Sequence, residues 1–125
     1  MNLTTQTGNR GEDLIAQWLT QTHQARLLDR HWTCRMGELD LVAQFPDGTI
    51  AFIEVKTRSP RNWDQDGLLA LSTGKQRKLV KTAQLYLLAH PNLADAPCRF
   101  DVAIVALKQG TYSLKTYIQN AFEAP

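Results

Sequence analysis

The segment GELDLVAQFPDGTIAFIEVKTR, residues 37–58, constrains the fold most, because it predicts two strands joined by a tight turn. On both sides of the turn, apolar residues alternate with other residues at a period of two, which is typical of strands. Pro46 suits the second position of a type I turn, and Gly48 suits the left-handed residue that follows it. Together they predict a three-residue loop with a glycine bulge, which pairs Phe45 with Thr49.

This register brings charged side chains together inside the hairpin. Counting outward from the turn, Asp40 lies opposite Glu54, and Glu38 lies opposite Lys56. A two-residue loop would instead send Asp40 and Glu54 to opposite faces of the sheet. Opposed carboxylates repel each other, and Mg²⁺ relieves that repulsion because it binds one or two protein carboxylates together with water and phosphate.

Lys56 projects from the same strand face as Glu54, two residues earlier. A lysine in this place can orient or deprotonate a water molecule, or neutralise charge on a phosphoryl group. The alternative is a surface hairpin with ordinary cross-strand pairs of glutamate and lysine, since one face of an antiparallel sheet is often polar. The hairpin therefore predicts either a metal-assisted active site or a solvated sheet face.

The remaining chain predicts helices and strands around this hairpin. Apolar residues at helical spacing predict a helix in 9–22, and Ser72 can cap a second helix that ends before Pro91. Further strands are predicted at 25–36, 98–107 and 112–118. The polar segment 59–71 predicts a long loop, and such loops often carry function. The order αβββαββ in 125 residues predicts one domain of mixed α/β (α+β) class, residues 1–125.

Charge is distributed unevenly along the chain. Residues 56–81 carry seven lysines and arginines against two aspartates, whereas the rest of the chain has more acidic than basic residues. A basic segment beside an acidic remainder fits a polyanion, and a solvated helix face is the alternative. The candidate phosphate contacts are Arg58, Lys75, Arg77 and Lys78. Trp63 in the long loop fits base stacking or simple anchoring.

Composition also predicts what the protein lacks. No apolar run approaches the roughly 20 residues that span a bilayer, and the first residues lack a basic-then-apolar signal, so we expect a cytoplasmic protein without membrane association. Cys34 and Cys98 have no CxxC spacing and predict reduced thiols. No ligand spacing links the histidines, which predict no special role: His23, His31 and His90.

Asp40, followed after a strand–turn–strand spacer by Glu54-Val55-Lys56, resembles the signature of the PD-(D/E)xK nuclease superfamily. Leu39 stands where that motif has its proline. A longer match is carried, in order, by GNRGEDLIAQWL, GELDLVAQ, AFIEVKTR, KQRKLVKTAQLYL and CRFDVAIV. Over about residues 8–107 these segments closely resemble the YraN family of small bacterial proteins, which is similar to archaeal Holliday junction resolvases.

The resemblance implies a restriction-endonuclease-like αβββαββ core, with a mixed central sheet flanked by helices. It implies Mg²⁺ or Mn²⁺ at Asp40 and Glu54, with Lys56 as the catalytic lysine and Glu12 as a further catalytic carboxylate. Glu12 has an alternative explanation, because acidic residues favour the first turn of a helix. We expect Glu38 to pair with Lys56 and Asp101 to pair with a nearby arginine.

The function that the resemblance implies is metal-dependent endonuclease cleavage of DNA, with branched DNA as one candidate substrate. The alternative is a non-catalytic module that binds nucleic acid or protein on the same fold. DNA is the expected partner, no small-molecule cofactor is expected, and a homodimer stays open.

Overall fold

The computed structural model describes residues 3–59 and 71–124 of the chain. Most of the predicted loop, including Trp63, lies outside the described residues. The elements in chain order are α1 (Leu3–His23), β1 (Arg26–Cys34), β2 (Gly37–Gln44), β3 (Ile50–Arg58), α2 (Thr73–Ala89), the short 3₁₀ helix η3 (Pro91–Leu93), β4 (Cys98–Lys108) and β5 (Thr111–Phe122). The predicted order αβββαββ is confirmed, with η3 as an addition and longer closing strands.

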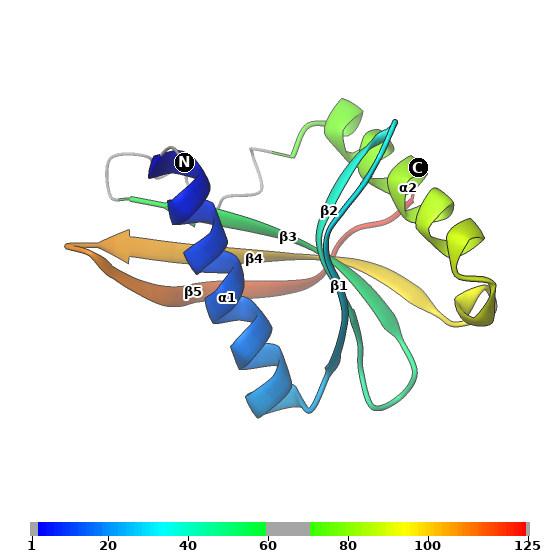
Figure 1. Cartoon of the computed structure of the whole chain (residues 1–125), viewed down its shortest axis with the longest axis horizontal. Coiled ribbons are helices and arrows are strands. Elements are labelled where there is room, and N and C mark those ends of the chain that lie inside the picture. Colours follow the sequence, from blue (N-terminus) through cyan, green and yellow to red (C-terminus); the bar gives the residue numbers. More distant parts are fainter. Residues whose placement is uncertain (1–2, 60–70, 125) are drawn as a thin grey trace.

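The five strands form one mixed sheet in the order β1-β2-β3-β4-β5 (Figure 1). Neighbouring strands are antiparallel except β3 and β4, which are parallel. A parallel pair needs a crossover, and α2 lies in the connection between β3 and β4. The prediction of a mixed central sheet flanked by helices is therefore confirmed.

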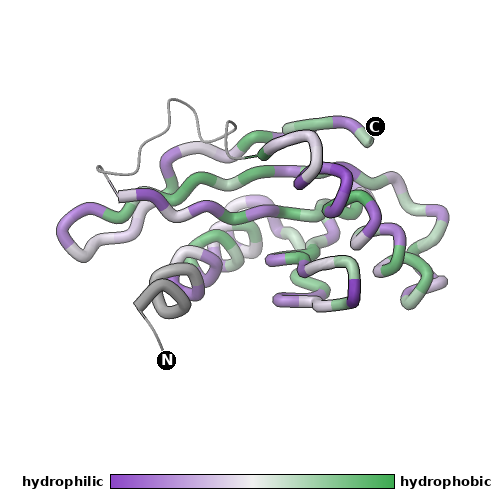
Figure 2. Tube along the Cα trace, turned by 90° about the horizontal axis from the view of Figure 1, so that it is seen from above, coloured by the Kyte–Doolittle hydropathy of each residue, from purple (hydrophilic) through white to green (hydrophobic). Residues whose placement is uncertain are grey.

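The two helices cover opposite faces of the sheet because side chains alternate along β3. Ala51 and Ile53 pack in a cluster with Ile15 and Leu19 of α1. Their neighbours on β3 belong to a second cluster, with α2: Ile50, Phe52, Ala83 and Tyr86. Hydrophobic residues accordingly follow the strands in Figure 2. Both faces of β3 are buried where the helices pack, which leaves its later residues to form the site.

The β2–β3 turn has the predicted conformation. The amide of Phe45 donates to the carbonyl of Thr49, and the amide of Gly48 donates to the carbonyl of Phe45, each at 2.9 Å. Gly48 has a φ of +93°, the positive value that the glycine bulge requires. The three-residue loop and its register are therefore confirmed.

The β2–β3 ladder ends at the pair Leu41–Ile53, although both strands continue. Beyond this pair β2 remains bonded to β1, while β3 remains bonded to β4 as far as Arg58. The two strands therefore separate as a fork. The prediction that Glu38 pairs with Lys56 is wrong, because these residues lie on the separated arms, where Glu38 contacts β1 and Lys56 contacts its own strand.

Asp101 has the structural role that the sequence predicted. Its side chain is buried and accepts hydrogen bonds from Arg99 Nε at 3.1 Å, Tyr117 Oη at 2.6 Å and the amide of Asn120 at 3.0 Å. Burial and the neighbouring carboxylate raise the pKa of Tyr117, so its hydroxyl remains a donor. The network joins β4 to β5.

Two predictions about composition have a structural counterpart. Cys34 and Cys98 are both free thiols, as predicted. Among the helices that the structure describes, none combines the length and apolar character needed to span a membrane.

Candidate functional site

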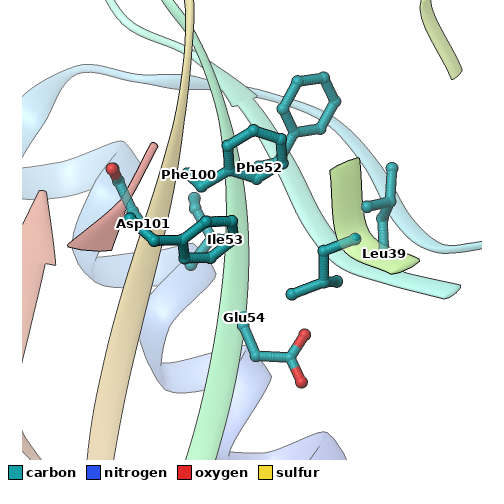
Figure 3. A pocket seen from close by; sticks show the side chains of 8 residues that line it. Leu39, Phe52, Ile53, Glu54, Phe100 and Asp101 are labelled. Carbon is teal, nitrogen blue, oxygen red and sulfur yellow. The ribbon is translucent and has the colours of Figure 1, made fainter. Parts of the chain in front are cut away.

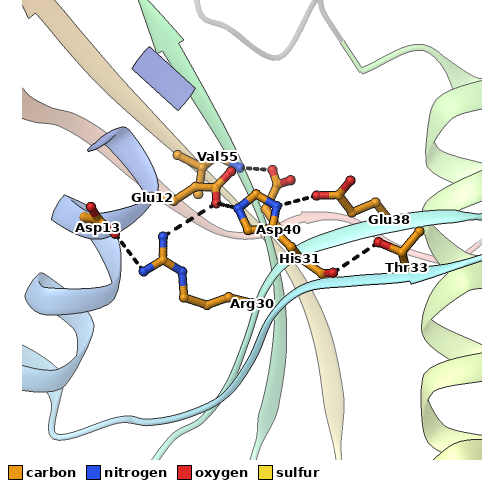
Figure 4. Close-up of polar contacts among 8 residues, drawn as sticks. All are labelled: Glu12, Asp13, Arg30, His31, Thr33, Glu38, Asp40 and Val55. Atoms are coloured by element: carbon orange, nitrogen blue, oxygen red, sulfur yellow. Dashed lines mark hydrogen bonds and ion pairs between the residues drawn. The ribbon is translucent and has the colours of Figure 1, made fainter. Parts of the chain in front are cut away.

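The fork between β2 and β3 places Asp40 beside Glu54. Continuing the register outward from Leu41–Ile53 puts Asp40 opposite Glu54, and the next backbone bond would join Leu39 to Val55. Instead the amide of Val55 donates to Asp40 Oδ2 at 2.9 Å (Figure 4). The carboxylate thus takes the place of a backbone acceptor, which fixes Asp40 at the point where the strands separate.

The carboxylates at the fork repel one another. Burial raises the pKa of Asp40 to about 7, and the charge of Glu54 adds to this effect against the opposing hydrogen bond from Val55. Burial also raises the pKa of Glu12, to which the charges of Glu38 and Glu54 contribute. Carboxylates from α1, β2 and β3 therefore share one region of negative potential. A cation bound in this region would reduce the repulsion among these carboxylates.

Two lysines contact the same oxygen of Glu54. Lys56 Nζ lies 3.2 Å and Lys75 Nζ 3.5 Å from Glu54 Oε1. Desolvation and the nearby Lys56 lower the pKa of Lys75. Lys75 was predicted to contact phosphate from the first turn of the second helix, and the structure places its ammonium beside the carboxylates, where a phosphate would also approach.

Glu12 reaches the fork because α1 packs closely on β3. A Cβ atom at Gly11 would lie 2.2 Å from Thr57 Oγ1, so glycine is needed for this approach. The side chain of Glu12 is 8% exposed, and its Oε1 lies 3.8 Å from Arg30 Nη2. The structure therefore places Glu12 beside the fork, where basic side chains of β1 contact its carboxylate.

His31 is the residue at this site that the sequence analysis missed. Its Nε2 lies 2.6 Å from Glu12 Oε1 and its Nδ1 lies 2.5 Å from Glu38 Oε1 (Figure 4). The hydrogen bond with Glu38 raises the pKa of His31, and donation to two ionised carboxylates requires a proton on both ring nitrogens. The interpretation of His31 as having no special role is wrong.

The backbone of His31 is also unusual. The residue has a φ of +52° within a strand, and the β1–β2 register places it opposite Asp40. Left-handed conformations of residues other than glycine cost energy and gather at functional sites. The register of β1 on β2 could have predicted that His31 lies opposite Asp40. A bulge between Leu27 and Asp29 shifts this register by one residue, and the sequence pattern does not reveal the bulge.

The carboxylates open into a pocket between the β1–β2 turn and α2. This site pocket has a volume of about 230 Å³ and is lined by Met36, Gly37, Glu38, Asp40, Glu54, Lys75, Lys78, Leu79 and Thr82. Behind Glu54, apolar side chains such as Phe52 and Leu39 leave a space of only about 10 Å³, about the size of one water molecule (Figure 3). The carboxylate of Glu54 therefore lies between a closed apolar interior and a pocket open to solvent.

The other predicted phosphate contacts are distributed around the pocket. Lys78 is exposed and lines the site pocket. Arg58 ends β3, and its Nη1 donates to the carbonyl of Thr57 at 3.2 Å. Arg77 lies on a different side of α2, in a depression shared with Val80, Lys81 and Gln84, so the structure does not bring it to the carboxylates.

Asp40 and Glu54 fit a hard divalent cation by their chemistry. They are opposed, partly buried carboxylates, and the pKa of Asp40 is raised by burial and, to a lesser extent, by the charge of Glu54. Within the described ranges, no three side chains of His, Cys, Asp or Glu form a ready-made metal cluster. A cation here would therefore take two protein carboxylates and complete its shell with water or phosphate, which is the usual arrangement for Mg²⁺.

Comparisons with known proteins identify relatives by sequence. The model of the family described as "Uncharacterised protein family UPF0102" matches residues 11–105. A UPF0102 protein of Thermosynechococcus vestitus is 50% identical over 115 residues, which are 92% of each chain. A UPF0102 protein of Acaryochloris marina is 54% identical over 125 residues, covering 92% of this chain and 72% of that one.

Two solved structures have a more distant similarity. A structure of EndoMS with double-stranded DNA has a TM-score of 0.40 at 12% identity, covering 72% of this chain and 34% of that one. Pyrococcus furiosus SfsA in complex with Ca²⁺ has a TM-score of 0.43 at 13% identity, covering 92% of this chain and 64% of that one. At these scores, function has to be argued from the site itself.

Proposed function

The chain belongs to the UPF0102 family, the YraN family that its motifs resemble, and we propose that it is a metal-dependent nuclease that hydrolyses phosphodiester bonds in DNA. The observation that carries the proposal is the opposed pair Asp40 and Glu54, which lies at the fork and lines an open pocket. Lys56 contacts Glu54 from the same strand. An opposed pair of carboxylates destabilises a sheet unless a cation binds it.

In the proposed site, Asp40 and Glu54 hold Mg²⁺ or Mn²⁺. The bound cation supplies Lewis acidity and neutralises charge on a phosphoryl group. Lys56, with its Nζ 3.2 Å from Glu54, donates hydrogen bonds to a water or phosphate oxygen and stabilises the charge that develops there. Glu12, held by His31 and Arg30, provides a further acceptor for a water molecule on the α1 side.

DNA is the proposed substrate because of the charges on α2. Lys75 and Lys78 line the site pocket, and the helix, residues 73–89, contains no aspartate or glutamate. Phosphate contacts of this kind dominate affinity for nucleic acid without specifying a sequence. Branched DNA is the candidate substrate that the sequence resemblance adds.

A second candidate is a nucleic-acid-binding module without catalysis. Two ammonium groups already neutralise Glu54, so part of the repulsion at the fork is relieved without metal. A binding module would keep the basic pocket and lose the response to metal. The two functions therefore differ in their dependence on a divalent cation.

Cleavage assays distinguish the two. Labelled linear, flapped and four-way-junction DNA would be incubated with the protein in Mn²⁺ and in EDTA, alongside Asp40→Asn and the surface control Asp95→Asn. We expect cutting of at least one substrate in Mn²⁺, none in EDTA, and none by Asp40→Asn, because one of the two carboxylates would then be an amide. Cutting by Asp40→Asn at the rate of the control would exclude the proposed site.

A further inference from the structure

A second basic depression lies on the other side of the β1–β2 turn from the site pocket. This outer groove has a volume of about 280 Å³ and is lined by Arg35, Met36, Lys81, Gln84, Leu85 and Leu88. Met36 lines both this groove and the site pocket. The turn therefore forms a wall between two neighbouring hollows, and Figure 1 shows it lying beside α2.

The spacing of residues on α2 explains why both hollows contact the same helix. Residues 75, 78, 79 and 82 line the site pocket, and residues 81, 84, 85 and 88 line the outer groove. Each set has the i, i+3, i+4, i+7 spacing of one helix stripe. The second stripe begins six residues, or about 9 Å, further along the helix and is rotated by about 120°. An extended ligand that leaves the site pocket past Met36 thus reaches the outer groove.

The basic side chains of the outer groove have no acidic partner among the residues that the structure describes. Arg35 and Lys81 are exposed, and neither forms an ion pair with any residue that the structure describes. Lys81 also lines a depression of about 350 Å³ with Arg77, which extends the positive surface around the helix. Since α2 has no acidic residue, this surface attracts anions.

The groove is not purely electrostatic. Leu88 is 77% exposed, and Leu85 and Met36 lie beside it. Alternating phosphates and sugars present both negative oxygens and apolar carbon atoms, so a nucleic-acid backbone matches basic ends around an apolar floor. A small free anion would match only the basic ends.

We propose that the outer groove is a second phosphate-binding subsite, where Arg35 and Lys81 bind the backbone of the nucleic acid that occupies the site pocket. The inference rests on the proposed function for the identity of the ligand, and it adds residues that contact DNA away from the reacting phosphodiester. The nucleic acid then bends around the β1–β2 turn, with Met36 between its two bound segments.

The test is DNA binding measured by fluorescence anisotropy in EDTA, which prevents cleavage. The variant Arg35→Gln/Lys81→Gln would be compared with Lys108→Gln/Lys115→Gln, which removes the same charge from the β4–β5 hairpin. Binding constants would be measured over a range of salt for single strands of about 4 and about 20 nucleotides and for a duplex of about 20 base pairs.

If each residue contacts one phosphate of a duplex, the double variant loses about 1.8 from the slope of log K against log salt. If the wild type and the double variant bind equally at 1 M salt, this difference in slope makes the affinity of the variant about 60-fold lower than that of the wild type at ~0.1 M salt. The short strand, which has too few phosphates to occupy both hollows fully, should show a smaller loss. The β4–β5 control should bind both lengths like the wild type.

The outcomes separate this inference from the proposed function. Equal binding by the groove variant and the control would overturn the inference, even if the wild type cuts DNA in Mn²⁺. A specific loss in the groove variant would support it, even if no DNA is ever cut. If wild-type protein binds no DNA, or if sedimentation shows a dimer that Leu88→Gln dissociates while DNA binding is unchanged, the groove is not a nucleic-acid subsite.

Discussion

Replacing Asp40 by asparagine should make the metal-free protein more stable at pH 8. The pKa of Asp40 is raised from 3.8 to about 7 by burial and by Glu54, so ionisation of this carboxyl opposes folding. The amide oxygen of asparagine can still accept the hydrogen bond from Val55. The substitution therefore removes the charge and keeps the hydrogen bond between β2 and β3 at the start of the fork.

The magnitude follows from the pKa. A change from 3.8 to about 7 corresponds to about 4 kcal/mol between the two protonation states, and relaxation of the coupled carboxylates reduces this to roughly 2–4 kcal/mol. Between these values the folded state binds more protons than the unfolded state. The free energy of unfolding of the wild type should therefore fall as pH rises from about 4 to about 7, and then level off in this contribution.

Urea denaturation in EDTA from pH 5 to pH 8 measures this difference. The stability advantage of Asp40→Asn should grow with pH, and the surface control Asp95→Asn should follow the wild type. Adding Mn²⁺ at pH 8 should stabilise the wild type through binding linkage and leave Asp40→Asn nearly unchanged. A variant that is less stable than the wild type at pH 8, or that responds equally to Mn²⁺, would refute the reasoning.

Three further changes test the arrangement around the fork. Gly11→Ala should cost about 1–3 kcal/mol in urea denaturation, because its Cβ would overlap Thr57, and a neutral result would contradict the close helix approach. Tyr117→Phe should cost about 1–3 kcal/mol by removing a donor from the buried Asp101, whereas unchanged stability would mean that the network is dispensable. His31→Ala should raise the pKa of Glu12, measured by ¹³C NMR, and an unchanged pKa would mean that His31 does not stabilise the ionised form of Glu12.

The hairpin could be predicted from the sequence because its determinants are local. Pro46 and Gly48 specify the turn, and a period of two then fixes which side chains share a face. Asp40 and Glu54 come together for this reason alone. The element order was equally accessible, since periodicity and the cap at Ser72 mark the helices and strands, and Ser72 does accept a bond from the amide of Lys75.

The rest of the site depends on contacts that local patterns do not specify. Glu38 and Lys56 separate because β2 and β3 leave each other to follow different neighbours, which a two-strand count cannot foresee. His31 enters the site through a bulge and a positive φ in β1. The ammonium of Lys75 reaches Glu54 only because α2 docks across that face of the sheet.

The most direct test of the central claim separates binding from chemistry at Lys56. Single-turnover cleavage in Mn²⁺ and DNA binding in Ca²⁺ would be measured for the wild type, Lys56→Ala and Lys108→Ala. Because Lys56 is proposed to act on the charge that develops during the reaction, we expect Lys56→Ala to lose cleavage while binding stays nearly intact, and Lys108→Ala to keep both. Tight binding of every DNA form without cleavage by the wild-type protein in Mn²⁺ would contradict the nuclease and leave the binding module.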